Sequence, residues 1–244
     1  MVGQDPSEDL TVRQISDKVF AKEFLFNVEI TTPLLPSPYA EYPFLLIENF
    51  LDDESCQEII DSTHEDADSV DAALRSSSNT LDKKIRKTKI HTLSPLSQKQ
   101  YDVAFDALRP EIETFFSLSL SSSTAPQLLE YTEGSFYRAH SDDSSVMVSK
   151  SGKIVGFKQV APQRKITTLL FVSDQVEEVQ TPYEFSGGSL LFNYFSGEDG
   201  KVLTLRPKMG SLIVFGSNPI YTHEVLPVTD GRRVSVAQWH DAIL

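Results

Sequence analysis

The stretch HEVLPVTDGRRVSVAQW, residues 223–239, contains two strand-like runs separated by Pro, Asp and Gly turn residues. Alternate side chains of a strand share a face. One face of the second run therefore joins a cation to small neighbours, and it consists of Arg233, Ser235, Ala237 and Trp239. If Val234 and Val236 pack outward, this face lines an interior with a charge and unfilled volume. A guanidinium pairs bidentately with a carboxylate, so we predict a pocket for a dicarboxylic acid with Arg233 as its partner, and with Arg232 as the alternative.

The chain from Pro126 onward predicts a β domain. Eight short runs are bounded by Gly, Pro, Asn, Asp or Ser, at residues 127–131, 135–140, 165–172, 189–192, 202–206, 211–215, 221–225 and 233–239. Two helices precede them: one over 54–64, capped by Asp52 or Asp53, and one over 98–116 with an apolar stripe. We also expect a short strand over 23–30, and loops over 66–82 and 117–123. Together these features predict an antiparallel sandwich or barrel backed by helices.

Three polar residues lie at the ends of these strand-like runs. His140 and Asp142 are two positions apart, so an extended chain directs them to the same face, and His223 lies on a distant run. Two histidines and one carboxylate form the ligand set of non-haem Fe(II) oxygenases. A His-x-Asp pair arises by chance in many chains, but the 233–239 pattern favours a metal site. Thr167 faces the same interior, where we expect its hydroxyl beside the bound acid or, alternatively, only a β-branched strand former.

Several motifs in a shared order carry a wider resemblance. They are PFLLIENFLDDESCQEII (43–60), LLEYTEGSFYRAHSDDS (128–144), RKITTLLFVSD (164–174), SGGSLLF (186–192), PKMGSLIVF (207–215) and the opening stretch. The chain thereby resembles the prolyl 4-hydroxylase-like branch of the Fe(II)- and 2-oxoglutarate-dependent dioxygenases. The resemblance implies that the catalytic iron is held by His140, Asp142 and His223. It also implies that Arg233 and Tyr131 bind 2-oxoglutarate, whereas Phe171 replaces a tyrosine that many relatives have.

The resemblance further implies a mostly β fold, a double-stranded β-helix or jelly roll backed by N-terminal helices. We expect a single catalytic domain over 1–244: a peripheral lead-in (1–42), a strand with supporting helices (43–125) and the double-stranded β-helix core (126–244). The implied reaction hydroxylates prolyl residues of a peptide or protein, consumes 2-oxoglutarate and O2, and releases succinate and CO2. Ascorbate is a further candidate cofactor. The loop 143–164, in which 146–155 predicts a hairpin, is expected to contact the substrate.

Two alternatives to peptide hydroxylation stay open. The first is the same chemistry on a free amino acid or another small molecule. The second is a barrel that binds a metal and an organic acid without catalysis, for which the missing hydroxyl at Phe171 is the motivating feature. The residues allow either a monomer or a homodimer.

Composition limits the possible partners. The chain has 22 Lys and Arg against 35 Asp and Glu, a net charge of −13. This charge argues against a nucleic-acid partner and favours a basic or neutral peptide over an anionic one. Cys56 is the only cysteine, which excludes an internal disulfide and a multi-thiolate metal site. Because we find no secretory signal and no apolar run of about 20 residues, we expect no membrane partner and a cytoplasmic location, with the nucleus as the alternative.

Overall fold

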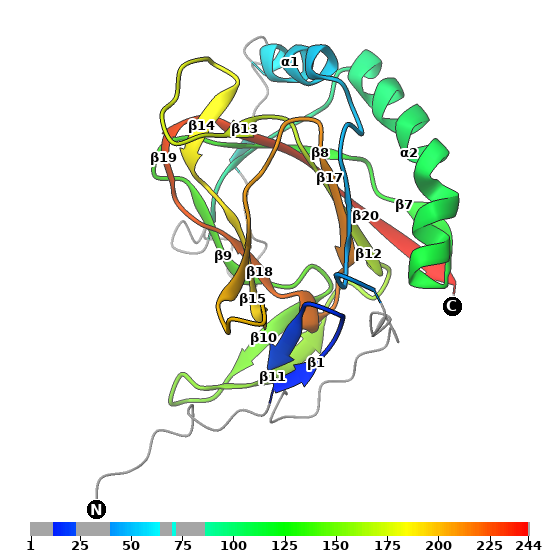
Figure 1. Cartoon of the computed structure of the whole chain (residues 1–244), viewed down its shortest axis with the longest axis vertical. Coiled ribbons are helices and arrows are strands. Elements are labelled where there is room, and N and C mark those ends of the chain that lie inside the picture. The colour runs from blue at the N-terminus through cyan, green and yellow to red at the C-terminus, as the bar shows by residue number, and fades with distance from the viewer. Residues whose placement is uncertain (1–11, 23–39, 64–69, 72–85, 244) are drawn as a thin grey trace, which may run out of the picture.

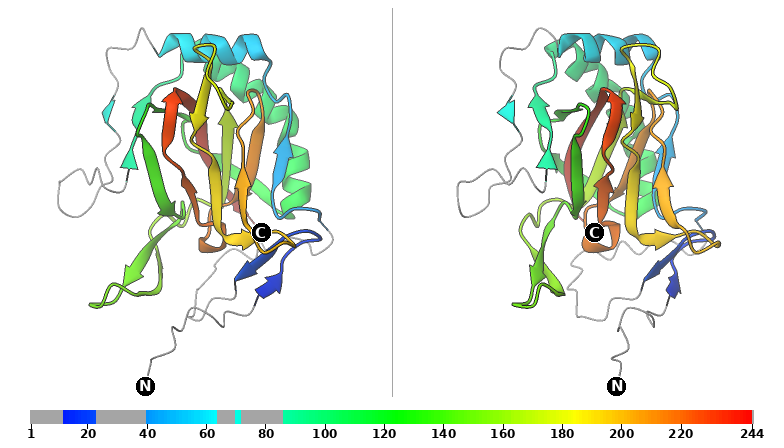
Figure 2. Two further views of the ribbon diagram at one scale, coloured as in Figure 1. Left: turned by 60° about the vertical axis from the view of Figure 1, so that its left-hand side comes forward. Right: turned by 90° about the vertical axis from the view of Figure 1, so that its left-hand side faces the viewer.

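The computed structural model describes residues 12–22, 40–63, 70–71 and 86–243. Two antiparallel sheets face one another and form the barrel, and two helices lie against the outside of one sheet (Figures 1 and 2). The mostly β jelly-roll prediction is therefore confirmed. Among the described residues, neither helix combines the length and apolarity that crossing a bilayer requires.

The larger sheet has eight strands and carries the helices. Its strand order is β3 (Leu45–Ile47), β17 (Leu212–Gly216), β12 (Ile166–Phe171), β20 (Arg233–Ile243), β8 (Gln127–Tyr131), β6 (Lys89–His91) and β4 (Val70–Asp71), with β7 (Ser119–Ser123) also paired to β20. The helices are α1 (Asp53–Ser62) and α2 (Pro95–Phe116). Because β20 pairs with β12, β8 and β7, it joins most of this sheet.

The smaller sheet has seven strands and closes the barrel. Its order is β1 (Val12–Gln14), β2 (Phe20–Lys22), β15 (Leu190–Ser196), β18 (His223–Val225), β9 (Phe136–His140) and β5 (Arg86–Lys87), with β16 (Val202–Leu205) paired to β15. Two small sheets extend from the barrel, one of β13 (Asp174–Gln175), β14 (Glu184–Gly187) and β19 (Val228–Gly231), and one a hairpin of β10 (Ser144–Val148) and β11 (Ile154–Gln159). A short 3₁₀ helix, Pro219–Tyr221, precedes β18.

The larger sheet separates two apolar cores. The outer core lies under the helices and includes Val234 and Val236, as alternation along β20 predicts. The inner core fills the barrel between the sheets and includes Tyr131, Phe171 and Ala237. The inward face of β20 therefore contacts the apolar interior at Ala237 and carries Arg233 at its start.

Local sequence explains the helix ends. The Asp52 side chain accepts a hydrogen bond from the Ser55 backbone N at 2.7 Å, which satisfies a free donor at the start of α1. Ser94 caps α2 in the same way, and Pro95 occupies its first turn. The helix ends at Ser117, which adopts the left-handed conformation with φ of 52°.

The sequence missed several short strands. We predicted a loop over 117–123, but β7 lies there, because its backbone pairs with the second half of β20 and buries Leu120. The predicted loop over 66–82 contains β4, which pairs with β6. The expected strand over 23–30 lies outside the described residues.

Candidate metal centre

Two neighbouring strands bring the predicted metal ligands together. His140 ends β9, His223 begins β18, and the two residues are directly paired in the antiparallel register. Asp142 follows two positions later. One potential ligand atom from each of these three residues lies within 4.8 Å of the other two. Among the described residues this is the one such group of His, Cys, Asp or Glu.

Both imidazoles are held with the same ring nitrogen available. His140 Nδ1 is 2.9 Å from the carbonyl oxygen of Arg138, and His223 Nδ1 is 2.9 Å from that of Tyr221. Nδ1 is the donor in each case because a carbonyl can only accept. These hydrogen bonds leave Nε2 of each ring as the nitrogen available to ligate a metal.

The His140 ring is also fixed by its neighbours. It stacks on Tyr137 with ring centroids 3.5 Å apart, and its centroid lies 4.4 Å from that of His223. Burial, with His223 nearby, lowers the pKa of His140 to about 3. This histidine is therefore neutral near pH 7 and needs to release no proton to bind a metal.

Asp142 is held by two elements. Thr167 on β12 donates a hydrogen bond to Asp142 Oδ2 at 2.7 Å, and Ser217 lies 2.8 Å from the same hydroxyl. Arg164 donates to the backbone oxygen of Asp142 at 3.2 Å while its guanidinium stacks on Trp239. Burial alone would raise the pKa of Asp142, but the two imidazoles and the Thr167 hydroxyl lower it below its usual value. The carboxylate is therefore ionised and oriented.

Arg233 lies deeper in the barrel, with only 1% of its surface exposed. Its Nε donates to the Gly188 carbonyl at 2.9 Å and one Nη donates to the Ser235 hydroxyl at 3.2 Å. The other Nη has no hydrogen-bond partner among the described residues, and no acidic side chain pairs with it there. Burial lowers the pKa of Arg233, while Tyr131 acts to raise it. A buried cation with an unused donor fits the carboxylate of an organic acid.

Two aromatic rings flank this guanidinium. Its central carbon lies 5.0 Å from the Tyr131 ring centroid and 5.8 Å from that of Phe171. The Tyr131 ring thus lies beside the Arg233 guanidinium, and its contact with a bound acid stays a prediction. The Thr167 hydroxyl contacts Asp142, and its place beside a bound acid stays a prediction. The contacts of Ser217 with Thr167 and of Arg164 with Asp142 could not be predicted from the sequence, although Arg164 ends the predicted substrate loop.

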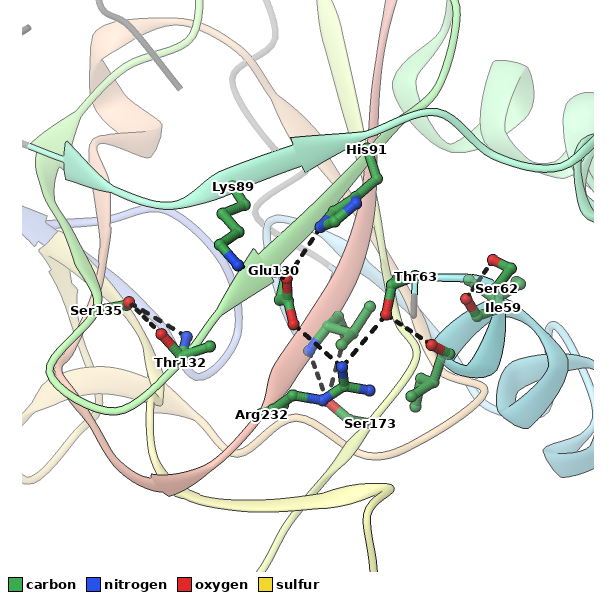
Figure 3. Close-up of polar contacts among 12 residues, drawn as sticks. Ile59, Ser62, Thr63, Lys89, His91, Glu130, Thr132, Ser135, Ser173 and Arg232 are labelled. Carbon is green, nitrogen blue, oxygen red and sulfur yellow. Dashed lines mark hydrogen bonds and ion pairs between the residues drawn. The ribbon is translucent and has the colours of Figure 1, made fainter. Parts of the chain in front are cut away.

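The second arginine of the pair, which the sequence left as the alternative, contacts other residues. Arg232 donates to Glu130 Oε1 at 3.2 Å and to the Thr63 hydroxyl at 3.3 Å, on the outer side of the sheet (Figure 3). The opposite oxygen of Glu130 lies 2.9 Å from His91 Nε2. Glu130 is only 6% exposed, so its carboxylate is buried against Arg232 and His91.

The donor set fits the group that this geometry suggests. Two imidazoles and a carboxylate, with an arginine nearby for an organic acid, suit non-haem Fe(II) and 2-oxoglutarate. The three candidate ligands come from β9, β18 and the turn after β9, so they lie at one end of the barrel. α1 lies at the other end (Figure 1).

Comparison with known proteins supports this interpretation. Several solved structures share the fold. A prolyl-4-hydroxylase from Pseudomonas putida is 23% identical, with a TM-score of 0.57, covering 81% of this chain and 91% of that one. A prolyl hydroxylase from Trichoplax adhaerens, solved with a hypoxia-inducible factor peptide fragment, is 19% identical, with a TM-score of 0.61 and coverages of 81% and 83%. A collagen prolyl hydroxylase of Paramecium bursaria Chlorella virus-1 is 17% identical, with a TM-score of 0.52 and coverages of 82% and 96%.

These identities are low enough that the structures establish the fold alone. A search of curated proteins found no match. The family comparison is more specific, because residues 126–241 match the model of the 2OG-Fe(II) oxygenase superfamily, and this segment contains the His-Asp-His group and Arg233. The match covers a little under half of the chain, and over residues 126–241 the chain is similar to the 2OG-Fe(II) oxygenase superfamily.

Proposed function

We propose that this protein is an Fe(II)- and 2-oxoglutarate-dependent dioxygenase that hydroxylates prolyl residues in a peptide or protein. One observation carries the proposal: His140, Asp142 and His223 converge within 4.8 Å, in the barrel that also buries the unpaired Arg233. Either feature alone has simpler explanations. Together they supply a site for a metal and for the acid that the superfamily uses with it.

Each residue has a defined task in this proposal. His140 and His223 would bind the metal through Nε2, because their Nδ1 atoms are engaged by backbone carbonyls. Asp142 would bind as a carboxylate whose orientation Thr167 maintains. Arg233 would pair with the distal carboxylate of 2-oxoglutarate, between the rings of Tyr131 and Phe171. When bound, the metal and cosubstrate supply oxidation of a C–H bond by O2, coupled to formation of succinate and CO2.

The apolar surroundings have a separate task. The barrel interior beside these residues is formed by aromatic and aliphatic side chains, among them Phe192, Phe215 and Leu169. Such a lining excludes water from the reacting groups and orients the cosubstrate. The hairpin of β10 and β11 begins two residues after Asp142, which places a surface for an extended chain beside the metal centre. This placement supports a peptide rather than a free amino acid.

The decisive experiment measures succinate formation and substrate oxidation together. Purified protein with Fe(II), 2-oxoglutarate and proline-containing peptides should form succinate, and mass spectrometry should find one added oxygen atom in the peptide. His140→Ala should abolish both signals. His91→Ala should retain both, because His91 binds Glu130 outside the site. The proposal fails if metal-loaded protein that binds 2-oxoglutarate produces no succinate with or without any peptide.

A further inference from the structure

The charge of the substrate hairpin is opposite to that of the rest of the chain. Residues 144–173 contain Lys150, Lys153, Lys158, Arg164 and Lys165 and no acidic residue, so all 35 Asp and Glu lie elsewhere. The first three of these cations are exposed on the hairpin. Among the described residues, no acidic side chain lies within ion-pair distance of any of the three. The hairpin therefore presents unpaired positive charge to solvent.

Acidic residues gather at the opposite end of the barrel. The helix α1 and its cap contain five carboxylates, Asp52, Asp53, Glu54, Glu58 and Asp61. Figures 1 and 2 show α1 at one end of the barrel and the hairpin projecting beyond the other. A molecule with this separation of charge orients an approaching anion toward its basic end, even when its net charge is −13.

The hairpin also exposes apolar side chains between its cations. Met147, Val148, Ile154 and Val155 are each between 42% and 62% exposed. Met147 belongs to the same hairpin face as Lys158, because Met147 is paired with Gly156 and Ser145 with Lys158. On the opposite face, the Phe157 ring lies 6.5 Å from that of Tyr194. An exposed face that mixes apolar and basic groups suits peptide side chains better than a phosphate backbone, which needs mainly cations.

We propose that the hairpin selects an acidic peptide. The Asp or Glu residues would lie in the peptide segment that flanks the target residue and extends along β10 and β11. This inference rests on the proposed peptide hydroxylation and names its substrate class. It reverses the expectation of a basic or neutral peptide, because the local charge beside the metal centre differs from the net charge.

Chain geometry indicates where the carboxylates should lie. Ser145, the partner of Lys158, is three residues from Asp142, or about 10 Å along an extended strand. Val148, next to the tip that carries Lys150 and Lys153, is six residues away, or about 20 Å. An extended peptide alongside the hairpin therefore meets Lys158 about three residues from its target, and the tip about six to eight residues from it.

Peptide binding tests this inference without relying on turnover. The probes are fluorescent peptides of about 17 residues with one central proline, carrying Glu about three and seven positions to one side of it or to the other, each with a matched Gln version. Binding is measured by anisotropy to protein holding 2-oxoglutarate and Mn(II) in place of Fe(II). One Glu arrangement should bind tighter than its Gln version, and the difference should shrink with added salt.

Charge reversal supplies the matched controls. Lys158→Glu should weaken binding of the preferred Glu peptide about 3- to 10-fold, and should remove or invert its advantage over Gln. Lys99→Glu makes the same change of charge on an exposed position of α2 and should preserve the preference. In turnover assays the Lys158 effect should fall on KM, with kcat unchanged.

Three results would overturn the acidic-peptide inference: equal binding of Glu and Gln peptides, a preference that survives Lys158→Glu, or a single-stranded oligonucleotide that binds tighter than every peptide and displaces it. Failure of the proposed reaction would look different. It would leave selective binding of the Glu peptide intact while no peptide gained oxygen.

Discussion

Arg233 begins β20 and Arg232 directly precedes it, but their replacement by methionine is expected to produce opposite effects. Arg233 is buried with an unused donor and with no acidic partner among the described residues. Burying a charge opposes folding by several kcal/mol, and its two hydrogen bonds, to Gly188 and Ser235, return about 1 kcal/mol each. Arg233→Met should therefore leave the cosubstrate-free protein unchanged or more stable by up to about 2 kcal/mol.

The same substitution should remove binding of 2-oxoglutarate. A carboxylate left without its buried partner loses about 3–5 kcal/mol, which corresponds to a Kd raised about 10²- to 10⁴-fold. In the wild type, 2-oxoglutarate at 100 times its Kd, with Mn(II) to prevent turnover, should add about 2.7 kcal/mol of stability. For a chain of this size the melting temperature then rises by about 5–10 °C. Arg233→Met should show no such rise.

Arg232→Met is the matched control. It removes a partner of the buried Glu130, while His91 remains in contact with that carboxylate. Because the Arg232 side chain is 20% exposed, we discount the full penalty of a broken buried pair to about 1–3 kcal/mol of lost stability. Its rise in melting temperature on adding 2-oxoglutarate should be unchanged. The reasoning is refuted if Arg233→Met lowers the stability of the free protein by several kcal/mol and still responds to 2-oxoglutarate.

Three further predictions address other positions. Thr167→Val removes the hydrogen bond to Asp142 and should weaken metal affinity about 10-fold in a calorimetric titration, whereas an unchanged Kd would exclude a positioning role. Gly188 has φ of +62°, and a Cβ there would lie 2.8 Å from a buried ring carbon. Gly188→Ala should therefore lower the free energy of unfolding in urea by about 1–3 kcal/mol. The loss should exceed that of Gly200→Ala, whose added Cβ meets nothing within 4 Å. Burial lowers the folded-state pKa of His240 to about 3, so below pH 6.5 the unfolded chain binds the extra proton and stability falls, by about 2 kcal/mol between pH 6.5 and 5. His240→Gln should flatten this slope, and equal slopes in the two proteins would contradict the assignment.

Much of the barrel could be predicted because its strands alternate clearly or are continuously apolar. The predicted run 127–131 coincides with β8, and 165–172 encloses β12, which is buried at all six positions. β7 escaped prediction because its serine-rich sequence has low strand propensity, and its pairing with β20 is a long-range contact. β14 and β19 escaped for a similar reason, since each is four residues long and contains glycine.

In the site, too, the sequence predicted which residues gather but not which hydrogen bonds they form. The gathering of the His-Asp-His group could be predicted, because His140 and His223 end and begin strands and Asp142 follows β9 by two residues. Which oxygen the Thr167 hydroxyl contacts could not, because it depends on how β12 lies against the turn after β9. The contact of Glu130 with His91 and Arg232 was also missed, since these partners are 39 and 102 residues away in the chain.

The base of the β10–β11 hairpin connects the proposed substrate-binding surface to the segment that carries Asp142. The backbone N atoms of Val160 and Ala161, where the hairpin returns to the barrel, both donate to the carbonyl oxygen of Asp143, at 2.8 and 2.9 Å. That carbonyl belongs to the residue next to Asp142, whose own backbone oxygen is held by Arg164. A tilt of the hairpin cannot occur without pulling on the peptide units that bear the carboxylate. The hairpin that would contact a substrate is thus hydrogen-bonded to the residue next to a predicted metal ligand. A movement of the hairpin should therefore change the electronic spectrum of a transition-metal ion bound at this site.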